Sequence, residues 1–364
     1  MKHTGIELIK ALSCAFGPSG CEDAVRELII EQIEGSCDGY CVDKSGNLIA
    51  KIRGRGMDYD PADPRRVMLA AHMDEVGLMV TEITEDGYLR FGTIGAVDPR
   101  VLCGRHVLLG NETQAKGARA VPGIVASKAI HLQSADERSK ATPVRKMYID
   151  IGAKDAEDAR RLLSVGDVGV FASDFCTYGK DGSFIKGKAL DDRTGCALLI
   201  EVMRSLRENP ADMPFDLYFA FTTCEEVGIS GAGVAAFTIA PEAAIVLEAT
   251  AVNDLPGTTG ATRVATLGEG GVLSLVDQGT VYDVGFVEFA RRTAEIAGIP
   301  CQLKQSATSK TDAAPIQRSL DGVRVLGLSL PARYIHSASN VVMYKDYESS
   351  RDLVLAMLRA WQLA

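Results

Sequence analysis

The sequence lacks a run of about 18 apolar residues, the length that a membrane-spanning helix requires. It also lacks the apolar core of a secretory signal, because the first expected helix already carries Glu7 and Lys10. Basic residues are outnumbered, 39 against 48 acidic ones, and the formal net charge of −9 repels polyanions. We therefore expect a cytoplasmic protein that binds neither nucleic acid nor membranes.

Paired cysteines are also missing. The chain has nine cysteines but no CxxC pair, and only Cys37 and Cys41 lie close together. An odd, scattered set is typical of reduced thiols in a cytoplasm, rather than of a disulfide framework or a thiolate metal site. Cys196 and Cys224 have no histidine nearby in the sequence, so we expect small buried hydrophobes rather than nucleophiles.

What is present indicates a globular α/β protein. The 364 residues suffice for about two domains, and 46% hydrophobic with 24% charged residues exclude disordered and fibrous classes. Helical periodicity alternates with apolar runs. The expected helices are 6–16, 22–34, 194–206, 286–297 and 347–361, and the expected strands are 47–52, 67–71, 217–222, 244–247 and 323–328. This order predicts a mostly parallel sheet flanked by helices.

Residues 76–186 have a different character. Short strands such as 88–91 and 107–109 stand between glycine and proline turns, and helical periodicity is scarce apart from 156–163. The sequence therefore predicts an α/β domain made of residues 1–75 and 187–364, interrupted by a small β-rich domain over 76–186.

Five polar sites stand out in the α/β part, and four of them follow predicted strands. They are His72-Met73-Asp74, Asp191-Asp192 before a helix, Glu225-Glu226, Glu248, and His336. In open α/β sheets, ligands bind outside the carboxyl ends of the strands. We therefore expect these side chains to meet at one edge of one sheet.

Taken alone, each site has a plain structural explanation. A histidine can close a sheet edge, an aspartate can cap a helix, and Glu248 or His336 can belong to an exposed loop. The adjacent Glu225 and Glu226 are harder to explain, because desolvated neighbouring carboxylates repel by about a kcal/mol or more. A cation, or a proton on one of them, removes that cost. Together, two histidines and several carboxylates fit two metal ions that share a carboxylate.

Six motifs in this order resemble the M42 family of metallo-aminopeptidases, which comprises glutamyl, leucyl and lysyl aminopeptidases, some labelled endoglucanases. The motifs are Gly17-Pro18-Ser19-Gly20, Asp43-x-x-Gly46-Asn47, His72-x-Asp74-Glu75-Val76-Gly77, Ala189-Leu190-Asp191-Asp192-Arg193, Glu225-Glu226-Val227-Gly228 and Arg333-Tyr334-x-His336-Ser337. The resemblance runs from residue 17 to the end of the chain. Although each motif is weak alone, the set is specific.

The resemblance implies two divalent metal ions per subunit, with Zn²⁺ preferred over Co²⁺ or Mn²⁺. His72, Asp191 and Glu248 would hold one ion. Asp191, Glu226 and His336 would hold the other, so that Asp191 bridges the two.

The resemblance also implies the reaction. Glu225 would be the general base for a metal-bridging water, and Asp74 would orient His72. The activity would be release of N-terminal amino acids from short peptides. The inserted domain would be PDZ-like and serve oligomerisation or act as a lid, within a homo-oligomer such as a dodecamer.

Three departures from the family pattern bear on substrate preference or ligation. Glu248 stands where an aspartate is usual, and the stretch Leu267-Gly268-Glu269-Gly270-Gly271 replaces a more usual ending in Gly-Pro. The stretch 337–340, Ser-Ala-Ser-Asn, lacks the acid often found there.

Three other functions are open at this point. A related metal-dependent amidohydrolase or deacylase would use the same residues on non-peptide amides. A glycosidase would need two carboxylates about 5–9.5 Å apart across the scissile bond, which adjacent Glu225 and Glu226 do not suit. A non-catalytic scaffold would be expected to have lost one of the ligands.

Overall fold

The computed structural model describes residues 2–111 and 120–361. The helices are α1 Gly5–Cys14, α2 Asp23–Ile33, α4 Ala135–Ser139, α5 Ala156–Leu162, α6 Leu190–Glu208, α7 Ser230–Ile239, α8 Val284–Ala297, α9 Ala313–Gln317 and α10 Tyr344–Arg359. The strands are β1 Gly39–Val42, β2 Leu48–Ile52, β3 Arg65–His72, β4 Gly77–Ile83, β5 Leu89–Ile94, β6 His106–Gly110, β7 Val121–Ala126, β8 Tyr148–Asp150, β9 Val168–Phe171, β10 Cys176–Tyr178, β11 Phe184–Gly187, β12 Phe215–Thr222, β13 Ala243–Ala251, β14 Gly271–Leu273, β15 Cys301–Leu303, β16 Arg324–Ala332 and β17 Asn340–Met343.

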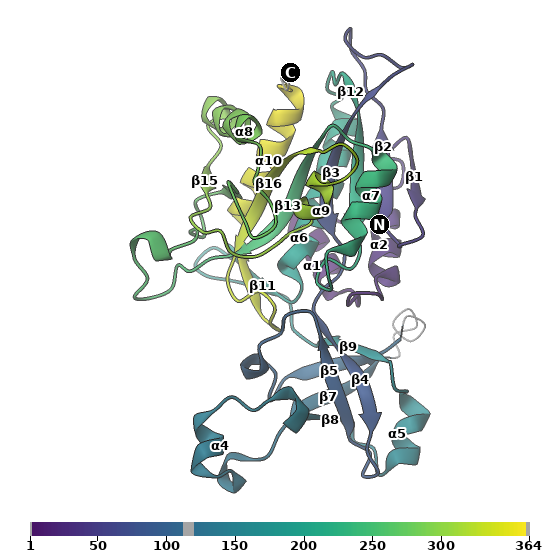
Figure 1. Cartoon of the computed structure of the whole chain (residues 1–364), viewed down its shortest axis with the longest axis vertical. Coiled ribbons are helices and arrows are strands. Elements are labelled where there is room, and N and C mark those ends of the chain that lie inside the picture. Colours follow the sequence, from purple (N-terminus) through teal and green to yellow (C-terminus); the bar gives the residue numbers. More distant parts are fainter. Residues whose placement is uncertain (1, 112–119, 362–364) are drawn as a thin grey trace.

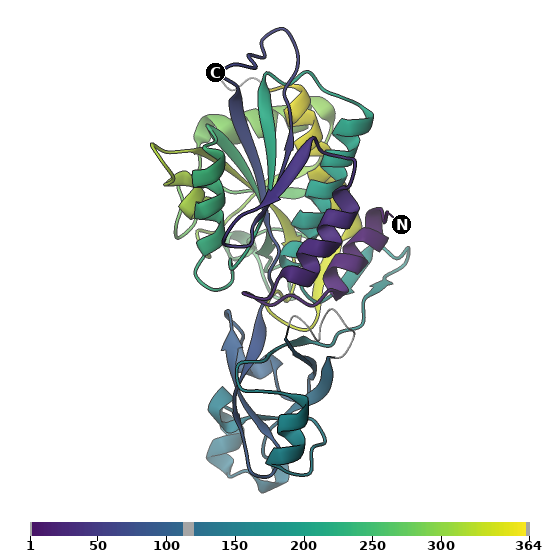
Figure 2. The ribbon, with the colours of Figure 1, turned by 90° about the vertical axis from the view of Figure 1, so that its right-hand side faces the viewer.

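The larger part of the molecule is built on an eight-stranded sheet of order β1-β2-β12-β3-β13-β16-β14-β15. Its four central strands, β12, β3, β13 and β16, run parallel to one another, whereas β1, β2 and β14 pair antiparallel toward the two edges. Helices lie on both faces, with α1, α2 and α6 on one side and α7 on the other (Figure 2). The predicted α/β class is therefore confirmed, with a sheet that is parallel at its centre and mixed at its edges.

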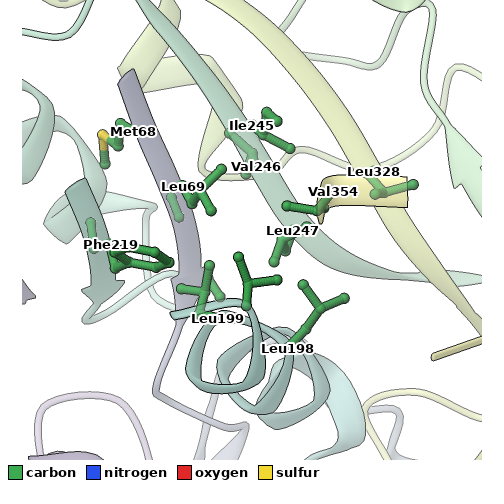
Figure 3. Packing of buried hydrophobic residues seen from close by; sticks show 14 of the residues in the cluster. Met68, Leu69, Leu198, Leu199, Phe219, Ile245, Val246, Leu247, Leu328 and Val354 are labelled. Carbon is green, nitrogen blue, oxygen red and sulfur yellow. The ribbon is translucent and has the colours of Figure 1, made fainter. Parts of the chain in front are cut away.

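The central strands are apolar along their length because both of their faces are covered. Leu69 of β3 and Leu247 of β13 lie above Leu199 of α6 in the main core (Figure 3). These side chains are at most 2% exposed. Burial of such a side chain contributes about 1.5–3 kcal/mol, so the strands that lead to the polar sites are anchored in the main hydrophobic core.

Between β3 and α6 the chain leaves this sheet and forms a closed six-stranded barrel of order β4-β5-β8-β7-β6-β9. Figure 1 shows the barrel below the large sheet, with α4 and α5 beside it. It has its own hydrophobic core, which includes Val80, Leu89 and Ile149. The following strands β10 and β11 form a separate three-stranded sheet with β17.

Two predicted strand ends differ from the observed ones at the polar sites. The strand predicted to stop at Leu247 continues to Ala251, so Glu248 lies inside β13, paired in register with Ser329 of β16. The strand predicted to stop at Leu328 continues to Ala332 through Pro331. The backbone N–H that Pro331 lacks is not needed there, since β14 pairs with β16 at Leu328 and Ser329 and does not extend to Pro331. Within residues 2–111 and 120–361, no helix is long and apolar enough to cross a membrane.

Candidate metal centre

The polar sites meet at the carboxyl ends of the central parallel strands. His72 is the last residue of β3, Glu225 and Glu226 follow β12, Glu248 lies near the end of β13, and His336 is in the turn after β16. Asp191 comes from the start of α6, which follows β11 in the sequence. Parallel strands bring their carboxyl ends to one edge of a sheet, which is why residues distant in sequence converge here.

Asp191 faces a different histidine with each of its two carboxylate oxygens. Its Oδ1 lies 3.5 Å from His72 Nε2, and its Oδ2 lies 3.5 Å from His336 Nε2. His72 Nε2 also lies 3.7 Å from Glu248 Oε2, and His336 Nε2 lies 3.4 Å from Glu226 Oε2. Two triads result, His72–Asp191–Glu248 and Asp191–Glu226–His336, and in each triad the ligand atoms lie within 4.8 Å of one another.

This donor set fits divalent metal ions. Atoms placed tetrahedrally about 2.0–2.2 Å from a common centre are about 3.3–3.6 Å apart, close to the separations within both triads. The donors are imidazole nitrogens and carboxylate oxygens, which suit Zn²⁺ and similar borderline ions. A carboxylate that serves both triads is the feature expected of a two-metal site.

Asp74 connects the first triad to the loop after β12. Its backbone oxygen and its Oδ1 lie 3.2 Å and 3.4 Å from His72 Nδ1, so the opposite ring nitrogen is left to face Asp191. The same carboxylate accepts hydrogen bonds from the N–H groups of Glu225 and Glu226 at 3.0 and 3.1 Å, and from Ser19 Oγ at 2.6 Å. Burial opposes ionisation of Asp74, but the hydrogen bonds that it accepts lower its pKa overall. One carboxylate thus orients the imidazole and places both glutamates.

The second triad is in contact with the barrel part of the chain. His336 Nδ1 lies 3.0 Å from the backbone oxygen of Ala96, so this nitrogen carries the proton and Nε2 is available as a ligand. The adjacent Gly95 has φ +77°, and a Cβ built there would lie 2.9 Å from Val76 Cγ1 and 3.4 Å from Glu226 Oε2. The segment after β5 therefore approaches both His336 and Glu226.

Glu225 stands beside the two triads without belonging to either. In the metal-free protein, burial and then the neighbouring acids, among them Asp312, raise the pKa of Glu225 to about 9. Burial and Asp191 raise the pKa of Glu226 to about 7. Nearby divalent cations favour the ionised forms and so reverse these shifts. A carboxylate that is close to the metals but not one of their ligands is suited to accept a proton.

The first triad accommodates Glu248, whose side chain is one methylene longer than that of an aspartate. β13 pairs with β3 only as far as Val246, so the two strands have already separated where Glu248 faces His72. Its Oε1 accepts the N–H of Asp312 at 3.3 Å, which leaves Oε2 toward the histidine. Asp254, the next acid along the chain, lies elsewhere and pairs with Arg333 at 2.7 Å.

A cavity of about 120 Å³ opens at this cluster. The acids Asp191, Glu225, Glu226 and Glu248 line one side, and the segment 308–311 lines another. Larger clefts occur elsewhere, including one of about 520 Å³ beside α4, but neither triad lies in it. The small cavity is therefore the place where a substrate would meet the triads.

Sequence reasoning missed several residues near the site. Asp312 is fully buried, accepts a hydrogen bond from Thr222 Oγ1 at 2.5 Å and has one oxygen without a partner among the described residues. Its sequence signal, an acid before the short helix α9, is that of an ordinary helix cap. Ser19 and Asn340 lie in stretches that the sequence analysis singles out, but neither residue type is a usual metal ligand or base, so their sequence predicts no role for them.

Of the two cysteines expected to be buried hydrophobes, Cys196 is buried but Cys224 is only half-buried. All nine lie within the described residues and none is in a disulfide. Cys196 is buried and donates to the backbone oxygen of His72, and burial raises the pKa of its thiol well above its usual range. Burial, then Glu22, raises the pKa of Cys224 to about 12. Neither thiol is primed as a nucleophile.

Comparison with known proteins agrees with this geometry. The family model for M42 glutamyl aminopeptidase matches residues 46–353. The lysyl aminopeptidase of Pyrococcus furiosus is 33% identical over 356 residues, covering 97% of this chain and 96% of that protein.

Solved structures show the same fold. A TET aminopeptidase from a marine sediment archaeon of the Thaumarchaeota has a TM-score of 0.91 at 34% identity and covers 98% of this chain and 96% of its own. The TET1 peptidase of Pyrococcus horikoshii, which can assemble into a tetrahedron or a large octahedral shell, has a TM-score of 0.82 at 32% identity, with 97% and 98% covered. The predicted family is confirmed: the chain belongs to the M42 family of glutamyl aminopeptidases and is a peptidase hydrolase.

Proposed function

We propose that the protein is a dinuclear metal-dependent aminopeptidase that releases N-terminal amino acids from short peptides. The observation that carries this proposal is the placement of Asp191, whose two oxygens each lie 3.5 Å from a different histidine. A carboxylate shared between two histidine-containing triads is the arrangement expected of a site that holds two metal ions. The relatives named as aminopeptidases support the choice of peptides as substrates.

We assign His72, Asp191 and Glu248 to one ion, and Asp191, Glu226 and His336 to the other. Zn²⁺ is the ion we expect, with Co²⁺ and Mn²⁺ as substitutes, because imidazole and carboxylate ligands accept all three. When bound, such ions polarise a carbonyl group, lower the pKa of water and can anchor a free amino group.

The remaining chemistry falls to Glu225. Its carboxylate accepts a proton from the attacking water while the water oxygen bonds to the scissile carbonyl carbon. As the carbon–nitrogen bond breaks, Glu225 gives that proton to the leaving amine. Asp74 supports both steps, since it holds the Glu225 N–H and keeps the His72 ring in place.

We propose that residues 1–75 and 187–364 form the catalytic domain and that residues 76–186 form a PDZ-like insert for oligomerisation or closure over the site. The barrel with its own core, and its contact with His336 through Ala96, support this division. The free thiols agree with a cytoplasmic location, which fractionation of the source cells would test.

Metal removal tests the proposed function directly. We expect two ions per chain by elemental analysis, loss of aminoacyl-p-nitroanilide hydrolysis on chelation, and recovery on adding Zn²⁺ or Co²⁺. Because the pKa of Glu226 is raised to about 7, protons compete for this ligand at lower pH. The neighbouring carboxylates, Asp191 first, outweigh burial and raise the pKa of His336 in the same triad to about 9. Affinity for the ion of that triad should therefore fall about tenfold per pH unit between pH 9 and 7, and up to about a hundredfold per pH unit below pH 7. Full activity in a metal-free sample would disprove the proposal, and hydrolysis of N-acyl amino acids alone would favour a deacylase.

Glu225 and Glu226 should respond differently to the same change. Glu225→Gln keeps the shape of the side chain but cannot accept a proton, so we expect both ions to remain bound and kcat to fall about 10²–10⁴-fold. Glu226→Gln serves as the matched variant and should lower the occupancy of one ion. Metal content and steady-state rates measured on both variants test whether Glu225 is the base and Glu226 the metal ligand. If Glu225→Gln loses metal and Glu226→Gln loses only rate, the two roles are reversed.

Glu248 should tolerate shortening better than removal. Glu248→Asp retains a carboxylate near His72, whereas Glu248→Ala removes the third donor of that triad. We expect Glu248→Ala to lose most of one bound ion and Glu248→Asp to lose less, as measured by equilibrium dialysis against Zn²⁺. Equal metal content in all three proteins would show that Glu248 is not a ligand.

The intact chain should form a large homo-oligomer, such as a dodecamer. The support is the assembly of the TET1 peptidase, which shares 32% identity and nearly full coverage with this chain. Light scattering at micromolar concentration measures the mass directly. A stable particle of 38.8 kDa, the mass of one chain, would contradict this expectation.

A further inference from the structure

The side chain of Asn340 joins the two chain segments that carry Asp191 and His336. Asn340 begins β17 and is 1% exposed. Its Oδ1 accepts the N–H of Leu190 at 3.1 Å, and Leu190 directly precedes Asp191. Its Nδ2 donates to the backbone oxygens of Tyr334 and Ser337, at 2.9 and 3.2 Å, and these two residues enclose His336 in the turn.

The three partners also fix which end of the amide is which. A backbone N–H can only donate and a backbone oxygen can only accept. The atom facing Leu190 must therefore be the amide oxygen, and the atom facing Tyr334 and Ser337 must be the nitrogen. An aspartate at this position could accept from Leu190 but could not donate to either carbonyl oxygen.

Both segments adopt backbone conformations that need support. Tyr334 and His336 have φ +59° and +56°, and Ala189, just before Leu190, has φ +51°. Residues other than glycine occupy this left-handed region at a cost, and they stay there only when surrounding contacts hold them. Asn340 supplies three such contacts from one buried group. Ser337 Oγ, which donates to the Tyr334 oxygen at 2.6 Å, tightens the same turn.

We propose that Asn340 is the positioning residue that sets the separation between the shared carboxylate of Asp191 and the imidazole of His336. That separation, 3.5 Å between Oδ2 and Nε2, belongs to the second triad. The first triad shares Asp191, but its other two members, His72 and Glu248, lie on β3 and β13 and not in the turn that Asn340 supports. Asn340 thus governs the affinity of one metal position more than the other. The inference rests on the proposed two-metal function.

The test is Asn340→Asp in the full-length chain, with Zn²⁺ affinities measured by competition with a chromophoric chelator. His336→Ala and His72→Ala identify which binding step belongs to which triad. We expect Asn340→Asp to weaken the His336 step about tenfold or more, since two hydrogen bonds are lost, and to change the His72 step by less than about threefold. Asn340→Ser, which is smaller and uncharged, should weaken the same step and serves if the aspartate variant does not fold.

Gln302 offers a matched control. This side chain also bonds three backbone groups, accepting from Thr266 N–H at 2.9 Å and donating to the oxygens of Thr266 and Gly270 at 2.9 and 3.0 Å. It belongs to neither triad. Gln302→Glu should therefore lower the melting temperature but leave both Zn²⁺ steps unchanged, which separates loss of stability from loss of positioning.

The outcomes distinguish this inference from the proposed function. If the wild-type chain binds fewer than two ions, the proposed function fails and the inference fails with it. The second outcome is that the wild-type chain binds two ions and the Asn340 variants keep the ratio of the two Zn²⁺ affinities, either because both are unchanged or because both fall by the same factor. This result would overturn only the positioning role of Asn340.

Discussion

The position of Asp191 depends on a buried guanidinium two residues further along α6. Arg193 is fully buried, and its Nε donates to the backbone oxygen of Met73 at 2.6 Å. Its Nη atoms reach the oxygens of Leu12 and Gly17, and Nη2 lies 3.2 Å from Glu75 Oε1. The start of α6 is thereby fixed to the chain that follows β3, between His72 and the barrel. Glu75 Oε1 also accepts a hydrogen bond from the buried Lys188 Nζ at 2.5 Å, so two buried cations share this carboxylate and hold it in place.

A second constraint is the number of acidic side chains that are buried near Asp191. Asp192 Oδ2 and Asp312 Oδ1 are buried without a hydrogen-bond partner among the described residues. Burial raises the pKa of Asp192 and Glu248 well above the usual range. In the metal-free protein Glu248 is therefore protonated, and a divalent cation held by the first triad would displace that proton. Because burial leaves the ionised carboxylates poorly solvated, a metal ion that pairs with them relieves this desolvation cost, and that relief contributes to the free energy of metal binding.

The fold and the polar sites could be predicted from local sequence, but their connections could not. Apolar runs ending in polar residues indicated that His72, Glu225, Glu226 and the turn of His336 lie at one sheet edge, because parallel strands share that edge. The extension of β13 past Glu248 was not predicted, since only pairing with β16, not the residue types, makes it a strand. Asp312 bonds to Glu248, which is 64 positions away, and Asn340 bonds to Leu190, which is 150 positions away. Only the contacts of Asn340 within its own turn are local. No local sequence pattern encodes the distant partners.

The two triads differ in what holds them. His72 and Glu248 lie on neighbouring strands of the central sheet, and Asp74 fixes the His72 ring from two residues away. His336 lies in a turn with left-handed residues, and its ring is oriented by Ala96 from the barrel part of the chain. His336 is therefore joined to the barrel part by a direct contact, whereas His72 is joined to it through residues 73–76, which bond to Arg193 and Glu225. Since Asp191 belongs to both triads, the geometry of the shared carboxylate depends on the strand supports of the first triad and on the turn and barrel contacts of the second.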